Sequence, residues 1–315
     1  MEKKHRVIVM YELHINNLLD IDLKKKYQTI YFDPPFNSNR TYAMNQSDST
    51  GFMDRWSDES YEEFITKCIN KLYDLLEKDG TLFFHISAVG MYIPEKVVRS
   101  KFKYVEPIFW KKARSKNNVK NKLGTTIDII WKCSKIAKPK FNIVYQPKDP
   151  KYLKTGFTNK DTRGHYSLGH LITEPTKQGY LYEFMGYNPT TGWRIKETEL
   201  IKLFEDDRIH IPSKKGAKLY KKIYLHENPG KPCTDLWDDI HSISQGLEVR
   251  RYPTAKPIKL LERIIEISSD PGDWVLDPMC GSGTTAGACE RLGRNCTLID
   301  VNPEVKEIVE KRCVK

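Results

Sequence analysis

The sequence predicts an α/β fold in which helices cover an open, largely parallel sheet. Three observations lead to this fold class. A strand-length apolar run, an amphipathic helical stretch and a second apolar run follow one another between residues 27 and 86. The same alternation returns between residues 258 and 300. The segment between residues 137 and 236 shows neither period, so we expect a sheet assembled from both ends of the chain, with a separate lobe inserted.

The first strand, helix and second strand are each bounded by clear signals. Residues 27–32 read YQTIYF and stop abruptly at Asp33-Pro34-Pro35. Residues 61–77 place apolar side chains at helical spacing, and Asp79-Gly80 supplies a stop. Residues 81–86, TLFFHI, then read as a buried strand. Strand, helix and strand in this order are typical of a parallel α/β unit and predict an open sheet of Rossmann type.

The C-terminal part continues the same pattern. Its elements are a helix over 258–268, a short strand over 274–276, a helix over 284–292 closed by Gly293, and a strand over 296–299 that ends at Asp300. The helix over 258–268 is amphipathic, and a glycine after the last periodic residue is a common helix stop.

The middle of the chain differs in composition. Eight prolines fall between residues 137 and 236, together with many glycines, lysines and tyrosines. We expect a loop-rich lobe there, with short elements such as a helix over 196–204.

The charge is concentrated in this middle part. The 315 residues carry a formal net charge of +11, yet residues 96–222 hold 29 basic and 11 acidic side chains, which leaves the remainder net acidic. A basic block is the footprint expected of a region that faces nucleic acid. A solvated lysine-rich surface is the alternative.

Composition also excludes several classes. Hydrophobic residues are 39% and charged residues 30%, and no uninterrupted apolar stretch reaches the length of a membrane span. The N-terminus leads into no signal-peptide core, so we expect a cytoplasmic protein without a membrane partner. The seven cysteines are scattered without a CxxC pair, and we expect reduced thiols and no metal site.

The first motif with chemical content is Asp277-Pro278-Met279-Cys280-Gly281-Ser282-Gly283-Thr284-Thr285, between a strand and a helix. Its glycines let the backbone approach a ligand, and the following helix offers unpaired N–H groups. The third glycine of the dinucleotide fingerprint and the GK[ST] of a P-loop are both missing. Asp300 ends the next strand, where a carboxylate can accept both hydroxyls of a ribose. The alternative is a tight turn with Asp277 as a helix cap.

The second motif is Asp33-Pro34-Pro35-Phe36-Asn37, at a strand end. The prolines have no N–H, so their carbonyls and the Asp33 carboxylate form an edge of acceptors only, which suits an amino group with two N–H donors. Phe36 adds a flat face for a planar heterocycle. A rigid turn with a buried aromatic is the alternative.

Together these residues resemble the amino-group DNA methyltransferases that use S-adenosylmethionine. Asp33-Pro34-Pro35-Phe36 matches the [DNS]PP[YFW] catalytic tetrapeptide, and DPMCGSGTT matches the cofactor loop written DPFxGSGTT. The catalytic motif comes first and the cofactor loop last, which resembles the circularly permuted beta arrangement. Further similar segments are Trp110-Lys111-Lys112, Gly192-Trp193-Arg194, Trp237-Asp238-Asp239-Ile240 and Tyr252-Pro253-Thr254-Ala255-Lys256-Pro257.

The resemblance implies a Rossmann-like class I methyltransferase sheet with an inserted target-recognition lobe. It places the catalytic domain in residues 1–137 and 236–315, and the recognition domain in residues 138–235. The implied catalytic residues are Asp33, Pro34, Pro35 and Phe36. The implied cofactor-binding residues are Asn16, Lys256, Asp277, Pro278, Cys280, Gly281, Ser282, Gly283, Thr284 and Asp300. Asn16 stands where family members often carry an aspartate, and Met279 where phenylalanine is common.

The resemblance implies a site-specific DNA adenine methyltransferase, because DPP[YF] in this order resembles the adenine enzymes. An enzyme of this kind is expected to act on duplex DNA, with the target base flipped out. A homodimer and a cognate restriction endonuclease are further partners that it suggests. In the middle lobe, Lys138, Lys140, Lys148, Lys151, Lys154, Lys160 and Arg163 are candidate phosphate contacts, and Arg163, Asn159 and Gln178 are candidate base readers.

Other functions stay open at this point. N4-cytosine methylation fits the same pocket chemistry, and RNA or a protein glutamine also presents an amino group. A catalytically silent DNA-binding subunit would keep the fold and the basic lobe. Trp193, Trp237, Tyr252 and His85 are expected to be packing residues, and Cys233 is not expected to be a nucleophile.

Overall fold

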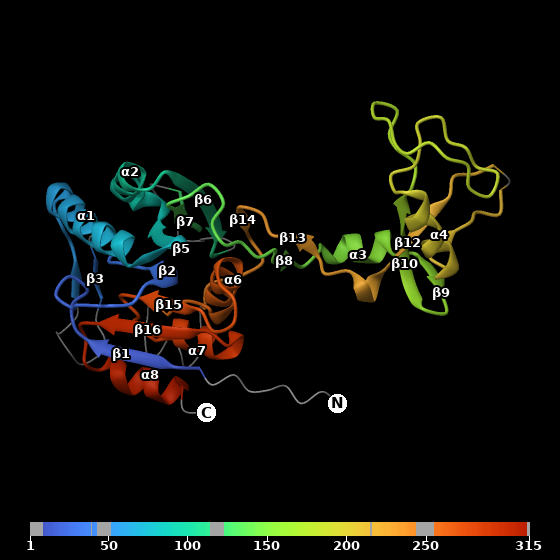
Figure 1. The fold of residues 1–315 in the computed structure, drawn as a ribbon. Helices are drawn as coiled ribbons and strands as arrows, with labels where there is room; N and C mark the ends of the chain where they lie inside the picture. Colours follow the sequence, from blue (N-terminus) through green and yellow to red (C-terminus); the bar gives the residue numbers. More distant parts are fainter. Residues whose placement is uncertain are drawn as a thin grey trace. The chain divides into compact units, whose positions relative to one another are not determined.

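A computed structural model describes residues 9–38, 40–42, 52–113, 123–214, 216–243 and 255–313 (Figure 1). The chain divides into two compact units. The first joins Met1–Val144 with Pro232–Lys315, and the second is Tyr145–Lys231. The predicted lobe, 138–235, is slightly longer at both ends than this second unit. Tyr252, Pro253 and Thr254 of the similar segments lie outside the described residues.

The first unit is built on an eight-stranded sheet. Five neighbouring strands run parallel, and β7 is antiparallel to both of its neighbours. In spatial order the strands are β1 (Tyr11–Ile15), β16 (Asn295–Asp300), β15 (Trp274–Asp277), β2 (Tyr27–Phe32), β5 (Leu76–Ser87), β7 (Ile127–Ser134), β6 (Tyr104–Lys111) and β14 (Leu236–Trp237). The predicted Rossmann-like α/β sheet, assembled from both ends of the chain, is confirmed.

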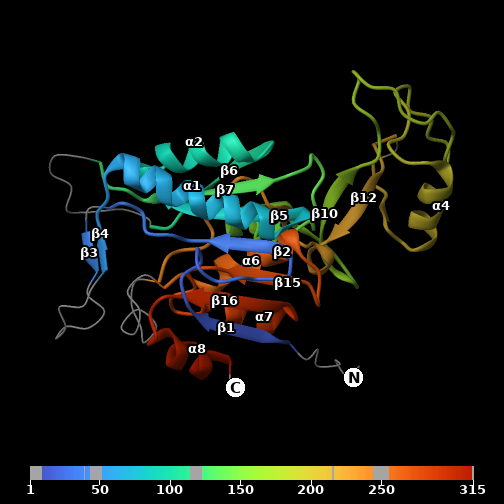
Figure 2. The same ribbon diagram turned by 60° about the vertical axis from the view of Figure 1, so that its left-hand side comes forward.

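Both faces of this sheet are covered (Figures 1 and 2). In β2, Ile30 and Phe32 join one core cluster and Tyr31 joins the other, as the alternation of side chains in a strand requires. On the first face lie α1 (Asp58–Leu75) and α2 (Tyr92–Lys101), and on the second α6 (Ile258–Ser268), α7 (Thr284–Leu292) and α8 (Val305–Cys313). Burial on both faces explains why YQTIYF is apolar without a period of two.

Helix ends agree with the local signals. The Ser57 hydroxyl caps α1 by accepting from the Ser60 N–H at 3.2 Å. Gly293, with φ of 71°, ends α7 where the sequence predicts it. The first helix begins and ends slightly earlier than predicted, and β5 begins before the predicted strand. In the described part of the chain, no helix has the length and apolar character that crossing a membrane requires.

The second unit contains a four-stranded antiparallel sheet; short elements are expected in this loop-rich lobe, but the sequence predicts none of these strands. Its strands are too short and too rich in histidine, lysine and tyrosine to show a hydrophobic period. In spatial order they are β11 (Ile209–His210), β12 (Tyr220–Tyr224), β10 (Gly164–His170) and β9 (Asn159–Asp161), accompanied by α3 (Pro150–Gly156) and α4 (Glu197–Glu205). Leu171, Trp193, Leu200, Ile209 and Leu219 form its core.

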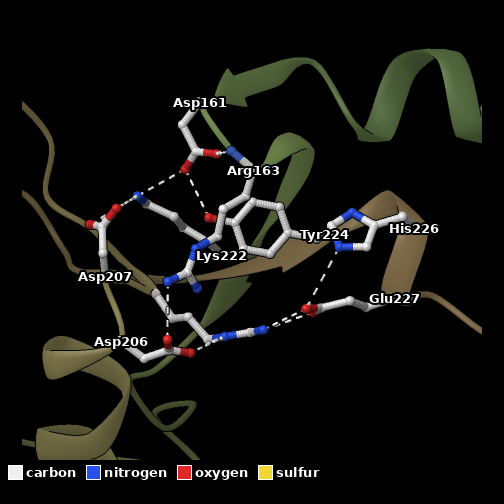
Figure 3. Close-up of polar contacts among 9 residues, drawn as sticks. Asp161, Arg163, Asp206, Asp207, Lys222, Tyr224, His226 and Glu227 are labelled. Atoms are coloured by element: carbon white, nitrogen blue, oxygen red, sulfur yellow. Dashed lines mark hydrogen bonds and ion pairs between the residues drawn. The ribbon is translucent and has the colours of Figure 1, made fainter.

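A network of ion pairs joins the strands of this sheet (Figure 3). The Lys222 ammonium lies 3.0 Å from Asp161 Oδ2 and 3.1 Å from Asp207 Oδ2. Arg208 contacts Asp206 at 2.6 Å and Glu227 at 2.5 Å. The Tyr224 hydroxyl donates to Asp161 Oδ2 at 2.8 Å. Much of the charge of this unit is therefore satisfied within it.

The remaining elements are short. They are β3 (Arg40–Tyr42), β4 (Phe52–Asp54), β8 (Tyr145–Gln146), β13 (Lys231–Pro232) and the 3₁₀ turns Ala88–Gly90 and Leu225–Glu227.

Candidate active site

The two motifs meet at one edge of the first unit's sheet. Asp33 follows β2, Asp277 ends the neighbouring strand β15, and Asp300 ends β16. Because these strands are parallel and adjacent, their carboxyl ends lie side by side, which is where open α/β sheets bind ligands. Topology therefore brings together motifs that are far apart in sequence.

A cavity of about 610 Å³ opens at this edge. Twelve of the predicted site residues line it: Asn16, Asp33, Pro34, Pro35, Phe36, Lys256, Asp277, Pro278, Cys280, Ser282, Thr284 and Asp300. Gly281 and Gly283 belong to the same loop but do not contribute to the wall that the described residues form.

Hydrogen bonds from Tyr61 and to Asp54 hold the loop that carries the catalytic tetrapeptide. The Tyr61 hydroxyl donates to the Pro35 carbonyl at 2.8 Å. The Asp54 carboxylate accepts from the backbone N–H groups of Asn37 at 2.8 Å and Ser38 at 2.9 Å. Asn37 has a φ of 52°, a left-handed conformation that asparagine tolerates. The Pro35 carbonyl thus already accepts one hydrogen bond, and Asp33 and the Pro34 carbonyl complete the expected acceptor edge.

The Asp33 carboxylate uses its two oxygens differently. Oδ2 is ion-paired with the Lys256 ammonium, which also lies 5.5 Å from the centre of the Phe36 ring. Oδ1 is buried and has no hydrogen-bond partner among the described residues. A buried carboxylate oxygen without a donor is costly, so this atom is prepared for a donor that a ligand brings.

The glycines of the second motif act within the protein. The Gly281 N–H donates to Asp300 Oδ2 at 2.8 Å. Gly283 has a φ of 66°, and a Cβ placed on it would lie 2.6 Å from Val309 Cγ2 of α8. Close packing against α8 therefore accounts for the glycine at 283, and direct contact of Gly281 and Gly283 with the cofactor stays a prediction.

Asp277 is a buried carboxyl at the base of the loop. It accepts from the Thr285 hydroxyl and, at 3.3 Å, from the Met279 N–H. Burial raises the pKa of Asp277 to about 7. It does not cap α7, whose N-cap is Gly283. Burial also raises the pKa of the Cys280 thiol well above its usual range, so this thiol stays protonated.

Asn16 and Asp300 line the same cavity and offer acceptors for the polar groups of a ligand. The Asn16 N–H donates to the Asp300 carbonyl at 2.9 Å, which joins β1 to β16 there. The Asp300 carboxylate accepts backbone N–H groups from Gly281 on Oδ2 and from Asn302 on Oδ1, and Val301 contributes a further backbone hydrogen bond. The Asn16 amide oxygen accepts from the Asn17 N–H at 2.7 Å and keeps a lone pair.

Several residues of the site escaped the sequence analysis. Tyr61 and Asp54 support the catalytic loop, and the wall also includes Asn17, Leu18, Tyr31, Phe64, Leu261, Thr285, Val301, Asn302, Pro303 and Glu304. Only the position of Thr285 in the cofactor-loop motif and of 301–304 directly after Asp300 offered a signal. The others are brought in by tertiary packing.

The expected packing roles of two tryptophans agree with the structure. Trp193 and Trp237 are buried, and their indole N–H groups donate to the carbonyls of Tyr182 at 2.9 Å and Thr234 at 2.8 Å. Near Trp237, Arg263 Nη1 pairs with Asp239 Oδ1 at 2.8 Å, so the 237–240 segment anchors α6. His85 is also buried, but it lies between the carboxylates of Asp33 and Asp128.

The predicted DNA-contact residues fall into different environments. Lys138 and Lys140 belong to the first unit, and the Lys140 ammonium is paired with Asp270 at 3.0 Å and Asp273 at 2.9 Å. Arg163 is paired with Asp206 at 3.0 Å. Lys151, Lys154 and Lys160 are exposed on the second unit. These exposed lysines fit phosphate contacts better than the paired side chains do.

Comparison with known proteins agrees with these features. Residues 27–311 match the family model of the N6/N4 DNA methylases. The chain is 29% identical over 297 residues to the type II methyltransferase M.EcaI of Enterobacter cloacae, covering 91% of this chain and 65% of that protein. It is 26% identical over 307 residues to M1.MboII of Moraxella bovis, covering 94% of this chain and 92% of that protein.

Similarity to M2.DpnII of Streptococcus pneumoniae is more local, at 41% over 102 residues, 31% of this chain and 37% of that protein. The chain thus spans under two thirds of the length of M.EcaI and of M2.DpnII. These are similarities to related proteins, and the match to the family model extends over most of the chain.

Solved structures show the same fold. The PvuII DNA methyltransferase, described as cytosine-N4-specific, aligns with a TM-score of 0.53 at 15% identity, over 96% of this chain and 87% of that one. A DNA modification methylase of Thermus thermophilus, TTHA0409, solved with S-adenosyl-L-methionine, aligns with a TM-score of 0.50 at 15% identity, over 97% and 93%. The class I methyltransferase fold is confirmed, and the chain belongs to the N6/N4 DNA methylase family, the amino-group DNA methyltransferases.

Proposed function

We propose that this protein methylates the exocyclic 6-amino group of a flipped adenine in duplex DNA, with S-adenosylmethionine as methyl donor. One observation carries the proposal. Asp33 Oδ1 is a buried acceptor without a donor among the described residues, and Asp33 lines a cavity that the cofactor loop also lines. An amino group is the donor whose chemistry fits that atom.

The residues present fit S-adenosylmethionine. Asp300, which lines the cavity at the end of β16, is the carboxylate for the ribose hydroxyls, and the Asn16 amide oxygen retains a lone pair for the adenine amino group. Pro278, Met279 and Leu261 supply apolar wall in the same cavity. When bound, S-adenosylmethionine supplies a methyl group on a positively charged sulfur. Gly281 and Gly283 are predicted to contact the cofactor through their backbone, and they also hold the loop against Asp300 and α8.

The catalytic tetrapeptide prepares the target nitrogen. The lone pair of an exocyclic amino group is delocalised into the ring, which makes the nitrogen a poor nucleophile. Hydrogen bonds accepted by Asp33 and the Pro34 carbonyl favour a more tetrahedral nitrogen, with its lone pair directed at the methyl group. Because the reacting atoms are held in line, most of the rate gain comes from positioning and electrostatics.

The target base has to leave the duplex before it reaches Asp33. Phe36 lines the cavity next to Asp33 and offers a flat apolar wall for the flipped base. The Lys256 ammonium is paired with the other oxygen, Oδ2, and therefore leaves Oδ1 for the amino group. We propose the second unit, within the predicted recognition domain 138–235, as the part that reads the DNA sequence.

N4-cytosine methylation is the second candidate. The PvuII enzyme has this specificity, but a shared fold does not select the base. Aspartate at the first position of the tetrapeptide, in this motif order, favours adenine. A homodimer and a cognate restriction endonuclease stay predictions from the resemblance, and the cytoplasmic location stays a prediction from the sequence composition.

The test is a labelling experiment. Wild type, Asp33→Ala and the surface control Asp74→Ala are incubated with methyl-labelled S-adenosylmethionine and unmethylated genomic DNA, which is then digested to nucleosides. We expect labelled N6-methyl-2′-deoxyadenosine from wild type and the control only. Labelled N4-methyl-2′-deoxycytidine would support the second candidate instead. No labelled nucleoside despite cofactor binding would overturn it, in favour of RNA, a peptide or a catalytically silent subunit.

A further inference from the structure

We infer that His85 takes up the proton that the target amino group loses on methylation. The proton reaches His85 through Asp33, so His85 is a positioning residue that acts on the substrate only indirectly. Asp128 contacts the other side of the His85 ring. This inference rests on the proposed function and concerns the same site. It gives a role to a buried histidine that the catalytic tetrapeptide does not include.

Methylation of an amino group requires such a proton acceptor. A bond forms between the amino nitrogen and the methyl carbon, and the bond from that carbon to sulfur breaks. The sulfur becomes a neutral thioether, and the nitrogen, having given its lone pair, must release one of its two protons to become a neutral secondary amine. One proton therefore leaves for each methyl transferred, and Asp33 is the first acceptor because it holds that N–H.

His85 lies directly behind Asp33. It is on β5, fully buried, and its Nδ1 is 3.8 Å from Asp33 Oδ1, the oxygen without a hydrogen-bond partner among the described residues. The hydroxyl of Tyr31, on the adjacent strand, lies 2.7 Å from the same Nδ1. The ring centres of Phe36 and Trp110 lie 5.8 Å and 5.4 Å from that of His85. These aromatic walls keep water away from the imidazole.

On its other side His85 meets a second carboxylate. Nε2 is 3.3 Å from Asp128 Oδ2, on β7, and Asp128 is almost completely buried. Asp128 Oδ1 lies 2.6 Å from the ammonium of Lys112, which is partly exposed. Although burial opposes its charge, hydrogen bonding to His85 and the nearby Lys112 lower the pKa of Asp128. Asp33, His85, Asp128 and Lys112, which we call the buried relay, thus form a line from the cavity toward the surface.

The hydrogen bonds assign the resting tautomer. Burial and the carboxylates of Asp33, Asp277 and Asp128 raise the pKa of Tyr31 well above its usual range, so its hydroxyl keeps its proton and donates to Nδ1. The proton of the neutral imidazole is then on Nε2, where it is donated to Asp128. Nδ1 is therefore the basic nitrogen of the ring. Its one lone pair accepts from the Tyr31 hydroxyl at rest, and Asp33 Oδ1 lies 3.8 Å away.

Proton transfer then follows in two steps. Asp33 Oδ1 receives the proton from the amino nitrogen, and the Tyr31 hydroxyl rotates away from Nδ1. Nδ1 takes the proton from Asp33, and the resulting imidazolium lies between two carboxylates, which stabilise its positive charge. Lys256, on the other Asp33 oxygen, and Lys112, behind Asp128, are the cations of this neighbourhood among the described residues. Asp277 is the further carboxyl that acts on Tyr31.

The test compares pH profiles of single-turnover methyl transfer for wild type, His85→Gln, Asp128→Asn and the exposed control His241→Gln. The DNA substrate is a duplex that contains the recognition sequence. This sequence is determined first, by mapping the methylated positions in genomic DNA that the wild type has modified. We expect the wild-type rate to rise with pH and then level off. We expect His85→Gln to change the shape of this profile and to be slower at the plateau by about 10²-fold, at the low end of general-base effects.

Binding and base flipping provide the second readout. DNA affinity and the fluorescence of 2-aminopurine at the target position should stay within about twofold of wild type in both variants, because the proton moves after the base is bound. Asp128→Asn retains a hydrogen-bond acceptor but not the charge, so we expect an intermediate rate. It replaces His85→Gln if that variant does not fold.

Two results would overturn the inference. The first is a pH profile of His85→Gln with unchanged shape. The second is a loss of base flipping equal to the loss in rate, which would make the histidine structural. If the wild type itself modifies no DNA, the proposed function fails instead, so the two failures are distinguishable.

Discussion

The Lys256 ammonium and the Asp33 carboxylate form an ion pair although 223 residues separate them in sequence. Both side chains are mostly buried in the wall of the cavity. The pair joins the catalytic tetrapeptide to the start of α6, and so links the two parts of the chain that build the sheet.

This pair predicts a specific energetic coupling. Lys256→Met removes one partner and leaves a largely buried charge on Asp33, so we expect a loss of about 2 kcal/mol of unfolding free energy. Asp33→Asn in the Lys256→Met background removes that charge, and the double variant should be more stable than the sum of the single effects. A double-mutant cycle in urea measures this, and strict additivity would show that the pair contributes nothing.

Asp277 predicts a pH dependence of stability. Its pKa of about 7 in the folded protein lies above its ordinary value of 3.8, so the folded state retains a proton that the unfolded chain has lost. The stability from this group is complete below the unfolded pKa and is lost as the pH rises through about 7. Asp277→Asn should remove a decrease on the order of 3 kcal/mol between pH 4 and 8.

Unfolding by urea across this pH range, without cofactor, is the measurement. Burial raises the pKa of Asp300 in the same direction, so some slope should persist in the variant. The lowered pKa of Asp128 acts only at more acidic pH, because its stabilisation is lost as the pH falls through the folded pKa. A slope identical to that of wild type would contradict the assignment to Asp277.

Tyr61 is expected to support activity without being required for the fold. Tyr61→Phe keeps the buried ring but removes the donor to the Pro35 carbonyl, so we expect a stability loss of about 1 kcal/mol. The catalytic loop loses a support, and kcat should fall by about tenfold because the reacting geometry is less well held. The cofactor affinity should be unchanged, and an unaltered kcat would show that Asp54 and the prolines suffice.

Gly283 and Gly272 form a matched pair for the cofactor loop. Both have positive φ, 66° and 91°, but a Cβ would meet Val309 only at Gly283 and would find open space at Gly272. Gly272→Ala should cost about 1 kcal/mol from backbone strain. Gly283→Ala should cost about 2 kcal/mol more, because α8 has to move. Equal losses in thermal or urea unfolding would contradict a packing role for Gly283.

Two lysines predict different effects on DNA binding. Lys154, exposed on α3, should contact phosphate, so Lys154→Gln should reduce the slope of log affinity against log salt by about 0.9. Lys140 is paired with Asp270 and Asp273, and Lys140→Gln should leave the slope unchanged. Titrations of nonspecific duplex at several salt concentrations make the comparison. If Lys140→Gln alone changed the slope, the DNA-binding surface would have to be assigned to the first unit.

Local signals predicted the parts of the fold that depend on them. The helices α6 and α7 begin and end where the sequence analysis places them, since an amphipathic period and Gly293 act over a few residues. The sheet of the second unit was missed, because its strands are stabilised by partners such as Lys222 and Asp161 that lie far apart in sequence. The antiparallel direction of β7 has no local signal either.

The sequence by itself determined which chemical groups this protein has: two motifs, their order, and the α/β alternation that places both at strand ends. Only the tertiary structure decided which atoms remain available. It assigned the Pro35 carbonyl to Tyr61 and the Gly281 N–H to Asp300, and left Asp33 Oδ1 facing His85. The physical reason is that a motif specifies residue types over a few positions, whereas hydrogen-bond partners and burial depend on neighbouring strands that the chain reaches only after long excursions.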